Sequence, residues 1–419
     1  MLKRLKVNGF KSLRDVEIRF PRLTVLFGPN AAGKSNILDA VEALSAIGTN
    51  RTLRDALHFI RGLPYEAFSF PSGGLPSLLA QKTAQFSLEA DVAVDGQAAD
   101  QFRYRVEVQI QPRTGVLSDQ DEYLAALSSR GEPTSARPRI EKMGDAIVVR
   151  HATTQGRGEH HDLGAHYTAL SNQRYSGQRF RAVEAVRNEL FGWRTYYLDP
   201  RVQMRWPQPP SAVVDIGPYG DNFAPFLFRL KSEHPKRFEA VRRTVRSLIP
   251  SVEDVSVDLD DKNGVIDVTV RQGGIDFSSR IISEGTLRVL ALCAIAVNPW
   301  GEALLALEEP ENGVHPRRLE LIADLLFHLA VTQQRQLIVT SHSLLFCDAI
   351  LKRVRQSDDP DCDVGLFKVQ QRGAETKVFP FETKGPLFQD PDIRRALTSG
   401  TEDGLFEGLV LRGMIDGDS

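Results

Sequence analysis

The sequence has few cysteines, no long apolar run and almost no net charge. Three cysteines occur in 419 residues, and their spacing fits neither a disulfide framework nor a cysteine zinc site. The longest apolar stretch, "VLALCAIAVNPW" after Arg288, is too short to span a bilayer. The first residues, "MLKRLKVNGF", lack the apolar segment of a signal peptide. These absences lead us to expect a cytoplasmic protein without a membrane segment.

Internal repeats, long low-complexity tracts and sustained heptads are also lacking. The formal net charge of −2 does not indicate bulk nucleic-acid binding, although it leaves room for local basic patches. The hydrophobic fraction of 42% and the charged fraction of 25% are those of an ordinary globular protein. The length predicts two or three structural units.

Strand-like and helix-like apolar patterns follow one another along the chain. The first forty residues predict two alternating strands, "LKRLKVNGF" and "DVEIRF", and a short buried strand, "LTVLFG". Residues 85–110 predict a hairpin around an Asp95-Gly96 turn, whereas residues 126–220 have weak periodicity and indicate an insertion. Later segments alternate between strands and helices and end in the hairpin "VGLFKVQQRGAETKVFPF". The pattern predicts a mixed α/β domain with a partly parallel sheet.

A glycine-rich segment follows the buried strand "LTVLFG". The segment "GPNAAGKS", residues 28–35, matches the phosphate loop G-x-x-x-x-G-K-[ST], and a helical apolar pattern begins directly after it. In such a loop, backbone N–H groups cradle the phosphates, Lys34 neutralises the β and γ charges, and the Ser35 hydroxyl binds Mg²⁺. The alternative is a chance glycine-rich turn, but the strand before the segment and the helix after it favour the phosphate loop.

Two adjacent carboxylates end a second buried strand. The stretch "ALLALEEPENGVHP", residues 303–316, passes from apolar residues into Glu308 and Glu309. Carboxylates at the end of a core strand are costly unless they face a cation or a polarised substrate. In a protein with a phosphate loop, we expect Glu308 to hold the Mg²⁺ shell and Glu309 to act on the attacking water. Solvated glutamates at a strand end are the alternative.

Two further segments point to anion binding. Ser283 opens the apolar helix of "IISEGTLRVLALCAIAV", so its hydroxyl and the N–H groups of the first turn form a candidate anion site. In "VTSHS", residues 339–343, His342 follows a buried strand and could contact a γ-phosphate. A lone histidine after a strand is usually structural, but the order of the motifs favours the functional interpretation.

Together these motifs resemble the ABC-type ATPase heads of the RecF, SMC and OLD group. "GPNAAGKS" resembles the Walker A loop, "ISEGTLR" the signature motif, "LLALEEPENGVHP" the Walker B motif with the D-loop, and "TSHS" the histidine switch. The opening "LKRLKVNGFKSLRDVEIRF" resembles the family's first strand pair, whose Phe-Lys-Ser turn tends to lie near the nucleotide. The resemblance covers residues 1–125 and 220–385, in family order, and is loose between them.

The resemblance implies an α/β fold, namely an ABC-type P-loop ATPase head that combines a mixed sheet, an antiparallel β-subdomain and a helical subdomain. About 250 positions separate Lys34 from Glu284, so we expect a compact insertion where SMC proteins carry a coiled-coil arm. The expected domains are lobe I at residues 1–125, an insertion or lid at residues 126–220, and lobe II with the C-terminal tail at residues 221–419. About 77 residues follow His342, mostly hairpin and tail, so no self-contained TOPRIM nuclease is expected.

The resemblance also implies ATP and Mg²⁺ as cofactors and assigns their ligands. Glu309, Lys34 and His342 are expected to be catalytic, and Ser35 and Glu308 to bind Mg²⁺. Glu308 stands where many phosphate-loop proteins have aspartate, so we expect it to reach the metal shell through water. The expected ATP contacts are Gly28, Pro29, Asn30, Ala31, Ala32, Gly33, Lys34, Ser35, Asn36, Ser283, Gly285, Lys11 and Ser12.

In this family two protomers dock head to tail around ATP, which implies a homodimer and leaves a higher oligomer open. The implied function is a Mg²⁺-dependent ATP hydrolase that uses ATP as a switch. It would control DNA engagement or a protein effector encoded nearby, in anti-phage defence or DNA maintenance. The alternatives are a nucleotide-gated scaffold that holds a toxin or nuclease with little turnover, and a RecF-like DNA-repair clamp.

Several weaker signals remain open. Candidates for the family's Q-loop glutamine are Gln81 and Gln85, while Asn312 and His315 belong to the D-loop region. The basic face of "PKRFEAVRRTVRSLIP" is either a nucleic-acid track or, as the safer interpretation, a solvated surface. "RHATTQGRGEHHDLGAHY" favours a polar hairpin loop over a zinc site. The turn "YLDPRVQMRWPQPP" resembles a lid from which Arg201 or Arg205 could reach phosphate, and the tail "GLFEGLVLRGMI" either docks on a partner or closes the core.

Overall fold

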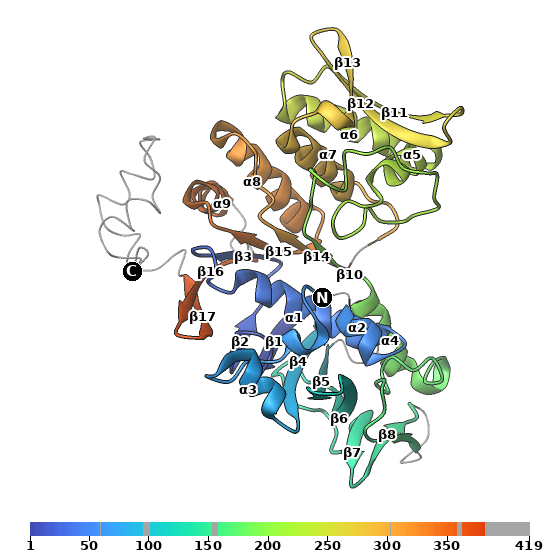
Figure 1. Ribbon diagram of the computed structural model, residues 1–419, viewed down its shortest axis with the longest axis vertical. Helices are drawn as coiled ribbons and strands as arrows, with labels where there is room; N and C mark the ends of the chain where they lie inside the picture. The colour runs from blue at the N-terminus through green and yellow to red at the C-terminus, as the bar shows by residue number, and fades with distance from the viewer. Residues whose placement is uncertain (59, 95–100, 153–157, 302, 358–362, 382–419) are drawn as a thin grey trace. The chain divides into compact units, whose positions relative to one another are not determined.

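The computed structural model describes residues 1–58, 60–94, 101–152, 158–301, 303–357 and 363–381 (Figure 1). These residues form two compact units, and each unit is assembled from separate stretches of chain. Unit 1 contains Met1–Pro21, Gly28–Trp193 and Phe367–Phe381. Unit 2 contains Arg22–Phe27 and Arg194–Leu366. The chain therefore leaves and re-enters both units.

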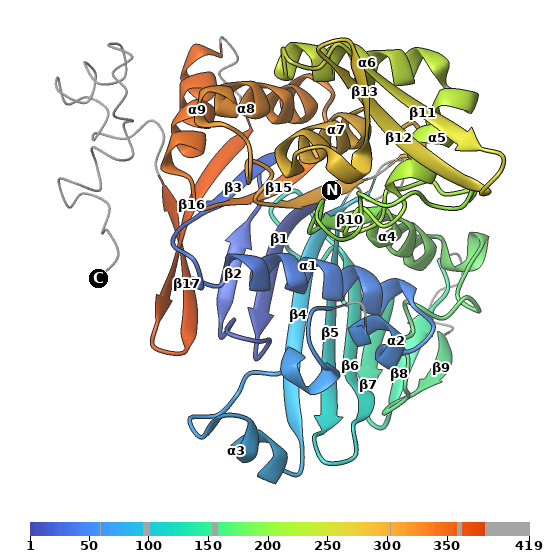
Figure 2. The same cartoon turned by 45° about the horizontal axis from the view of Figure 1, so that its top comes forward.

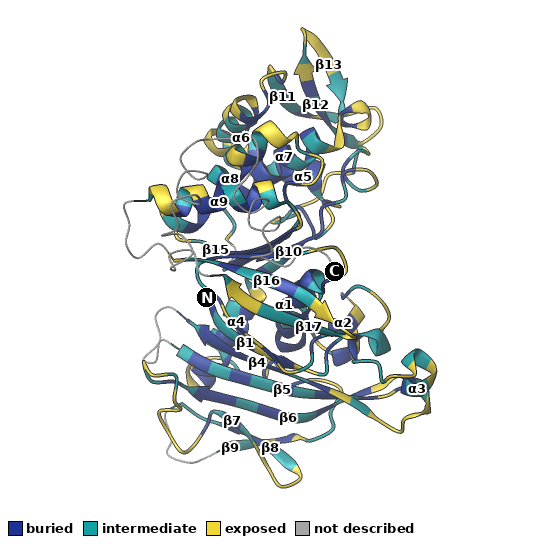
Figure 3. Ribbon diagram, turned by 90° about the vertical axis from the view of Figure 1, so that its left-hand side faces the viewer, coloured by how far each residue is buried: buried dark blue, intermediate teal, exposed yellow. Residues whose placement is uncertain are grey.

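An eight-stranded antiparallel sheet forms the centre of unit 1. Its strand order is β2-β1-β4-β5-β6-β7-β8-β9. Buried and partly exposed residues alternate along β5, because successive side chains point to opposite faces of a sheet (Figure 3). The strands are β1 Leu2–Asn8, β2 Val16–Arg19, β4 Ala84–Ala93, β5 Gln101–Gln111, β6 Val116–Ala126, β7 Ile140–Met143, β8 Ala146–Arg150 and β9 Gly158–Asp162.

Helices pack on this sheet and on one another. Figure 2 shows α1 (Lys34–Thr49) running across the strands of unit 1, and its apolar residues at helical spacing are buried. α1 packs against α2 (Leu53–His58) and α4 (Arg181–Phe191). The remaining helix is α3 (Gly74–Ala80). The predicted hairpin of residues 85–110 is confirmed by the antiparallel pairing of β4 with β5, although its Asp95-Gly96 turn lies outside the described residues.

Parallel strands form the centre of unit 2. β15 (Gln336–Ser341) lies between β3 (Leu23–Phe27) and β14 (Leu304–Glu308), and both pairings are parallel. β10 (Trp193–Tyr196) flanks β14, and β16 (Val364–Arg372) begins beside β3 before it enters unit 1, where it pairs with β17 (Glu375–Phe381). Every residue of β3 and β15 is buried, which is typical of parallel strands. The predicted partly parallel sheet is confirmed.

Helices and a small antiparallel sheet complete unit 2. The sheet consists of β11 (Asp254–Asp260), β12 (Val265–Gln272) and β13 (Ile275–Ser278), and α5 (Phe223–Glu233) and α6 (Pro235–Leu248) pack beside it. α7 (Glu284–Ala296) packs on α6, α8 (Leu319–Phe327) packs on α9 (Leu344–Gln356), and α9 packs on β3 and β15. This mixture of parallel strands, antiparallel sheets and helices confirms the predicted α/β class.

Several elements were not predicted, among them α2, α3, α9, the strands β6 to β10, α4 and β13. α4 lies within residues 126–220, where its apolar stripe of Val183, Val186 and Leu190 is interrupted by charged residues. β13 has only four residues and no clear alternation. The expected domain boundaries near residues 125 and 220 stay predictions. No helix in the described part of the chain is long and apolar enough to cross a membrane.

Candidate functional site

The glycine-rich segment forms the loop between β3 and α1. Gly33 has a left-handed backbone, with φ of 96°, and directly precedes Lys34, the first residue of α1. A Cβ atom at Gly33 would lie 1.9 Å from the hydroxyl of Thr376 on β17. A glycine is therefore required both by the backbone conformation and by the close approach of β17.

Lys34 folds over the loop that precedes it. Its side chain is buried, with 5% of the residue exposed. The Nζ atom donates hydrogen bonds to the carbonyl oxygens of Gly28 at 2.7 Å and Pro29 at 2.8 Å. Pro29, Asn30 and Ala31 are exposed on the loop. A cation and a helix N-terminus thus lie at one end of α1, where anions are stabilised.

The three parallel strands of unit 2 end level with one another. In the register, Phe27 of β3 pairs with Ser341 of β15, and Thr340 of β15 pairs with Glu308 of β14. Ligands of α/β proteins bind beyond the carboxyl ends of parallel strands. At this edge β3 continues into the glycine-rich loop, β14 into Glu309, and β15 into His342.

Glu309 and His342 are in contact. Glu309 Oε1 lies 2.9 Å from His342 Nδ1, and Asn312 Nδ2 donates to Glu309 Oε2 at 3.3 Å. The backbone of Glu309 is left-handed, with φ of 44°, which costs about 1–2 kcal/mol for a residue with a Cβ atom. Its N–H donates to the carbonyl oxygen of Thr340 at 3.1 Å and to the Thr340 hydroxyl at 3.3 Å. A strained backbone held in this way is frequent at functional sites.

Glu311 belongs to the same loop but was not among the predicted site residues. It is buried, with 4% of the residue exposed, and burial raises the pKa of its carboxyl group. Ser341 Oγ donates a hydrogen bond to Glu311 Oε1. Glu311 Oε2 is buried and has no hydrogen-bond partner among the described residues. Glu311 is the third glutamate of "EEPEN", so the motif itself contained it. Its hydrogen-bond partner Ser341 is distant in the sequence, and a local pattern could not predict that contact.

Ser283 caps α7. Its Oγ accepts a hydrogen bond from the Thr286 N–H at 3.2 Å and donates to the Thr286 hydroxyl at 2.8 Å. A Cβ atom at Gly285 would lie 2.1 Å from the carbonyl oxygen of Gly313, so the start of α7 touches the backbone of the loop after β14. The structure thus brings the predicted signature residues next to the predicted D-loop.

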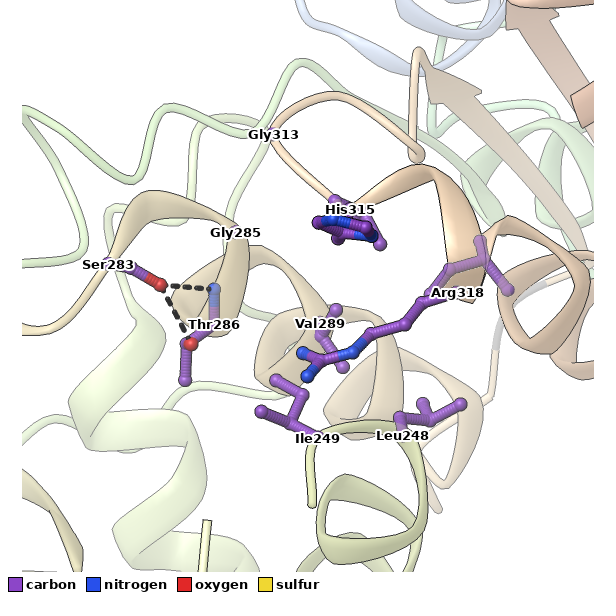
Figure 4. A pocket seen from close by; sticks show the side chains of 11 residues that line it. Leu248, Ile249, Ser283, Gly285, Thr286, Val289, Gly313, His315 and Arg318 are labelled. Carbon is purple, nitrogen blue, oxygen red and sulfur yellow. Dashed lines mark hydrogen bonds between the residues drawn. The ribbon is translucent and has the colours of Figure 1, made fainter. Parts of the chain in front are cut away.

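A pocket of about 190 Å³ lies beside this contact (Figure 4). The side chains that line it include Ser283, which caps α7, and Thr286 in its first turn. Figure 4 shows the Arg318 side chain extending toward Val289 and Ile249. None of its lining residues is acidic; they are Leu248, Ile249, Ser283, Gly285, Thr286, Val289, Gly313, Val314, His315, Arg318 and Ile322.

The proline-rich turn after β10 packs against the segment that leads to Ser283. Arg205 Nη1 donates to the carbonyl oxygen of Arg280 at 2.8 Å, and its Nη2 lies 3.8 Å from Glu284 Oε1. Ser279 Oγ donates to the carbonyl oxygen of Arg205 at 2.8 Å. The guanidinium of Arg205 is therefore engaged within unit 2, beside the predicted signature motif.

Comparison with known proteins identifies the family. The family model described as "AAA domain, putative AbiEii toxin, Type IV TA system" matches residues 23–348, which is well over half of the chain. The chain belongs to this family. It is an ABC-type ATPase of the RecF/SMC/OLD-like group, as the motifs predicted.

Curated relatives of this ATPase match over short stretches. The DNA replication and repair protein RecF of Rippkaea orientalis is 42% identical over 62 residues, 15% of this chain and 16% of the relative. The RecF protein of Synechocystis is 33% identical over 96 residues, 23% of each chain. The OLD nuclease of Thermus scotoductus is 48% identical over 42 residues, 10% of this chain and 8% of the relative. The matched stretches are thus well under two thirds of each relative.

Solved structures of SMC heads share the fold. An SMC head bound to the C-winged helix domain of ScpA has a TM-score of 0.52 at 13% identity, over 91% of this chain and 98% of that chain. An SMC head with an extended coiled coil, bound to the C-terminal domain of ScpA, from Pyrococcus furiosus, has a TM-score of 0.50 at 13% identity, over 94% of this chain and 99% of that chain. These similarities confirm the predicted ABC-type head fold.

The Phe-Lys-Ser turn of this ATPase is tied to its own unit. Lys11 Nζ lies 2.6 Å from Oδ2 of the buried Asp39, which Arg61 also contacts, and donates to the carbonyl oxygen of Arg61 at 2.9 Å. Ser12 Oγ lies 2.6 Å from Thr376 Oγ1 and accepts a hydrogen bond from Asn36 Nδ2 at 2.7 Å. Ser12 and Asn36 thus meet beside α1, whereas the Lys11 ammonium is held by Asp39.

Two open interpretations gain structural evidence. Among the described residues, no group of three His, Cys, Asp or Glu side chains could hold a metal ion. His161 instead lies on β9, and its ring is 5.1 Å from that of Tyr167. On α6, Arg242 pairs with Glu239 at 2.6 Å and with Asp254, and Arg246 lies 3.5 Å from Glu239. These internal pairs favour the solvated-surface interpretation of the basic face.

The positions of the other weakly predicted residues do not decide their roles. Gln81 and Gln85 are both exposed in unit 1, and Gln85 bonds to Gln109, so neither stands out as the Q-loop residue. Asn312 contacts Glu309, and His315 lines the pocket beside α7. The apolar tail "GLFEGLVLRGMI" lies outside the described residues.

Proposed function

We propose that this ATPase hydrolyses Mg²⁺-ATP in the cytoplasm and closes into a homodimer around the nucleotide. The observation that carries the proposal is the common edge of three parallel strands. There β3 leads into the glycine-rich loop, β14 into Glu308 and Glu309, and β15 into His342, with the strand ends in register. This is where α/β proteins bind their ligands.

Each side chain has a specific task in the proposed reaction. Lys34 is already aimed back over its loop, where it would neutralise the charge of the β- and γ-phosphates. The Ser35 hydroxyl and the Glu308 carboxylate are the hard oxygen donors that Mg²⁺ prefers, and the ion would neutralise charge that develops on the phosphates. Glu309 would orient the attacking water and accept its proton, and His342, 2.9 Å from Glu309, would hold that carboxylate and contact the γ-phosphate.

Dimerisation would complete the site from across the interface. In this scheme Ser283 and Gly285 of one protomer contact ATP bound to the Walker A loop of the other. A charge-assisted hydrogen bond contributes roughly 1.5–3 kcal/mol, so one at each of two sites gives about 3–6 kcal/mol. The dimerisation constant would change by about 10²–10⁴ on ATP binding. A change of that size makes ATP a switch, and hydrolysis would reset it.

The switch would control DNA engagement or a protein effector encoded nearby, in DNA maintenance or anti-phage defence. The short matches to RecF proteins support the DNA role. A nucleotide-gated scaffold that holds a toxin or nuclease is the second candidate. The description of the matching family supports it, because that description names the AbiEii toxin and a type IV toxin–antitoxin system. Turnover stimulated by duplex DNA would favour a RecF-like clamp. Slow, unstimulated turnover and copurification of the neighbouring gene's product would favour the scaffold.

Glu309→Gln tests the proposed reaction. The variant keeps the shape of the side chain but cannot accept a proton, so we expect ATP binding to persist while turnover falls at least 100-fold. ATPase activity and ATP binding are measured at equal protein concentration with and without Mg²⁺. Glu320→Gln is the control, because Glu320 is an exposed residue of α8 that pairs with Lys352 at 2.9 Å. A Glu309→Gln variant with wild-type turnover would overturn the assignment.

A further inference from the structure

Glu311 is a buried acid that joins two catalytic segments. It lies in the loop after β14, and its Oε1 accepts a hydrogen bond from Ser341, the last residue of β15. Ser341 Oγ also accepts from the Ser343 N–H at 3.0 Å. His342 is therefore flanked by two residues that the Ser341 hydroxyl holds together. The hydrogen bond between Ser341 and Glu311 joins residues that are thirty positions apart in the sequence.

The same two segments meet a second time at the proposed catalytic pair. Glu309 N–H bonds to Thr340, and Glu309 Oε1 lies 2.9 Å from His342 Nδ1. The loop is thus linked to the last two residues of β15, directly before His342: by Glu309 to Thr340, and by Glu311 to Ser341. Two links fix the direction of a loop, whereas one leaves it free to pivot.

Burial makes the Glu311 link costly, which argues that it has a purpose beyond packing. A buried carboxylate oxygen without a hydrogen bond is destabilising, and Glu311 Oε2 is such an atom among the described residues. Facing this loop from α7, Arg288 has a buried Nε that also has no hydrogen-bond partner there. Burial lowers the pKa of Arg288, and among the nearby carboxylates the charge of Glu311 opposes this shift most. The loop therefore lies between the signature helix and the end of β15.

We propose that Glu311 is a positioning residue for ATP hydrolysis: through Ser341, it fixes the distance between Glu309 and His342. The proposal rests on the proposed function of that pair. It predicts that the hydrogen bond matters for the rate of the chemical step and not for ATP binding, because neither Glu311 nor Ser341 contacts the nucleotide in this scheme.

A double-mutant cycle tests this role. We expect Glu311→Ala and Ser341→Ala each to lower kcat about 10- to 100-fold, the effect of misplacing a catalytic group by about 1 Å. The KM for ATP should change less than twofold. The double variant should lose no more than either single variant, because one hydrogen bond is removed in all three. Glu311→Gln keeps an oxygen acceptor for Ser341 and should retain kcat within threefold of wild type.

Several results would overturn the proposal. They are a folded Glu311→Ala variant with wild-type kcat, additive losses in the double variant, or a Glu311→Gln variant as slow as Glu311→Ala. Thermal melting monitors folding, and if Glu311→Ala does not fold, Ser341→Ala and Glu311→Gln still decide the question. A different result would refute the proposed function itself, namely wild-type ATP turnover by Glu309→Gln. That result does not depend on the activity of the Glu311 variants. An inactive Glu309→Gln with a fully active Ser341→Ala refutes only the positioning role.

Discussion

At the scale of single residues, carboxyl groups inside the protein behave in different ways. Glu309 is only partly buried and has His342 and Asn312 as partners. Glu122 on β6 is fully buried and accepts hydrogen bonds from Tyr104 OH and from the N–H groups of Ala169 and Leu170. Burial nevertheless raises the pKa of Glu122 to about 7. For Glu122, the effect of burial on the pKa therefore outweighs that of three hydrogen bonds to its carboxylate.

Asp119, also on β6, is the extreme case. It is fully buried, and neither of its carboxylate oxygens has a hydrogen-bond partner in the described part of the chain. Burial raises the pKa of Asp119 well above its ordinary range, and the charge of Glu122 adds to this effect. An acid with a raised folded-state pKa contributes stability that is fully present below its unfolded pKa. That stability is lost as the pH rises through the folded pKa.

Asp119→Asn should therefore stabilise the protein at high pH. Asparagine imitates the neutral carboxyl group, so the variant avoids ionisation of a buried group. We expect its free energy of unfolding to exceed that of wild type by about 1–3 kcal/mol at pH 8 and the difference to shrink towards pH 4. Urea unfolding at both pH values measures this. A variant that is less stable than wild type at pH 8 would show that Asp119 is charged and has a favourable partner.

At the scale of elements, the contact between α7 and the loop after β14 depends on two glycines. Gly285→Ala would bring a Cβ atom to 2.1 Å from the carbonyl oxygen of Gly313, which neither backbone can avoid without moving. We expect the free energy of unfolding to fall by about 1–3 kcal/mol and ATPase activity to fall with it. Chemical unfolding and steady-state turnover are the measurements.

Gly313→Ala is the matched comparison for that variant. Its Cβ atom would meet Gly285 at an ordinary 3.6 Å, so the variant bears only the cost of a left-handed backbone, with φ of 75°. That cost is about 1–2 kcal/mol. If Gly285→Ala were as active and stable as wild type, the contact between the signature helix and this loop would have to be looser than the structure describes.

Some elements were predictable from the sequence and others were not. β3, β14 and β15 are continuous apolar runs, each ending at a motif with a known chemical task, so local pattern sufficed for them. The sequence predicted that Glu309 and His342 each follow a buried strand, but it did not predict the contact between them. α4 and β13 were missed because one has charged residues within its apolar stripe and the other is only four residues long. The Glu311–Ser341 hydrogen bond joins distant positions, and no local pattern reports such a contact.

At the scale of the whole molecule, the central prediction is an ATP-dependent dimer. In the Glu309→Gln background, where ATP should persist, Ser283→Ala removes one hydroxyl contact from each of the two proposed composite sites. We expect the dissociation constant of the dimer to rise by up to about 10²–10⁴. Sedimentation over a range of protein concentrations, with and without Mg²⁺-ATP, measures it.

Ser232→Ala is the control for the dimer experiment, because Ser232 is exposed on α5 and its hydroxyl donates to the carbonyl oxygen of Phe228 in the same helix. It should leave the dissociation constant unchanged. Monomeric Glu309→Gln at all ATP concentrations would exclude the proposed closed dimer. A dimer that forms equally well with and without Ser283 would exclude its contact with ATP.

The assembly of unit 1 from three separate stretches has a consequence for synthesis on the ribosome. The loop with Lys34 is translated near the start, yet Thr376, which is fully buried against Gly33 and bonds to Ser12, comes more than three hundred residues later. Until β17 has emerged, a nascent chain carries the Walker A sequence without the strand that packs on it. The phosphate-binding loop is thus among the first parts to be made and among the last to be finished, so incomplete chains should not bind ATP as the full-length protein does.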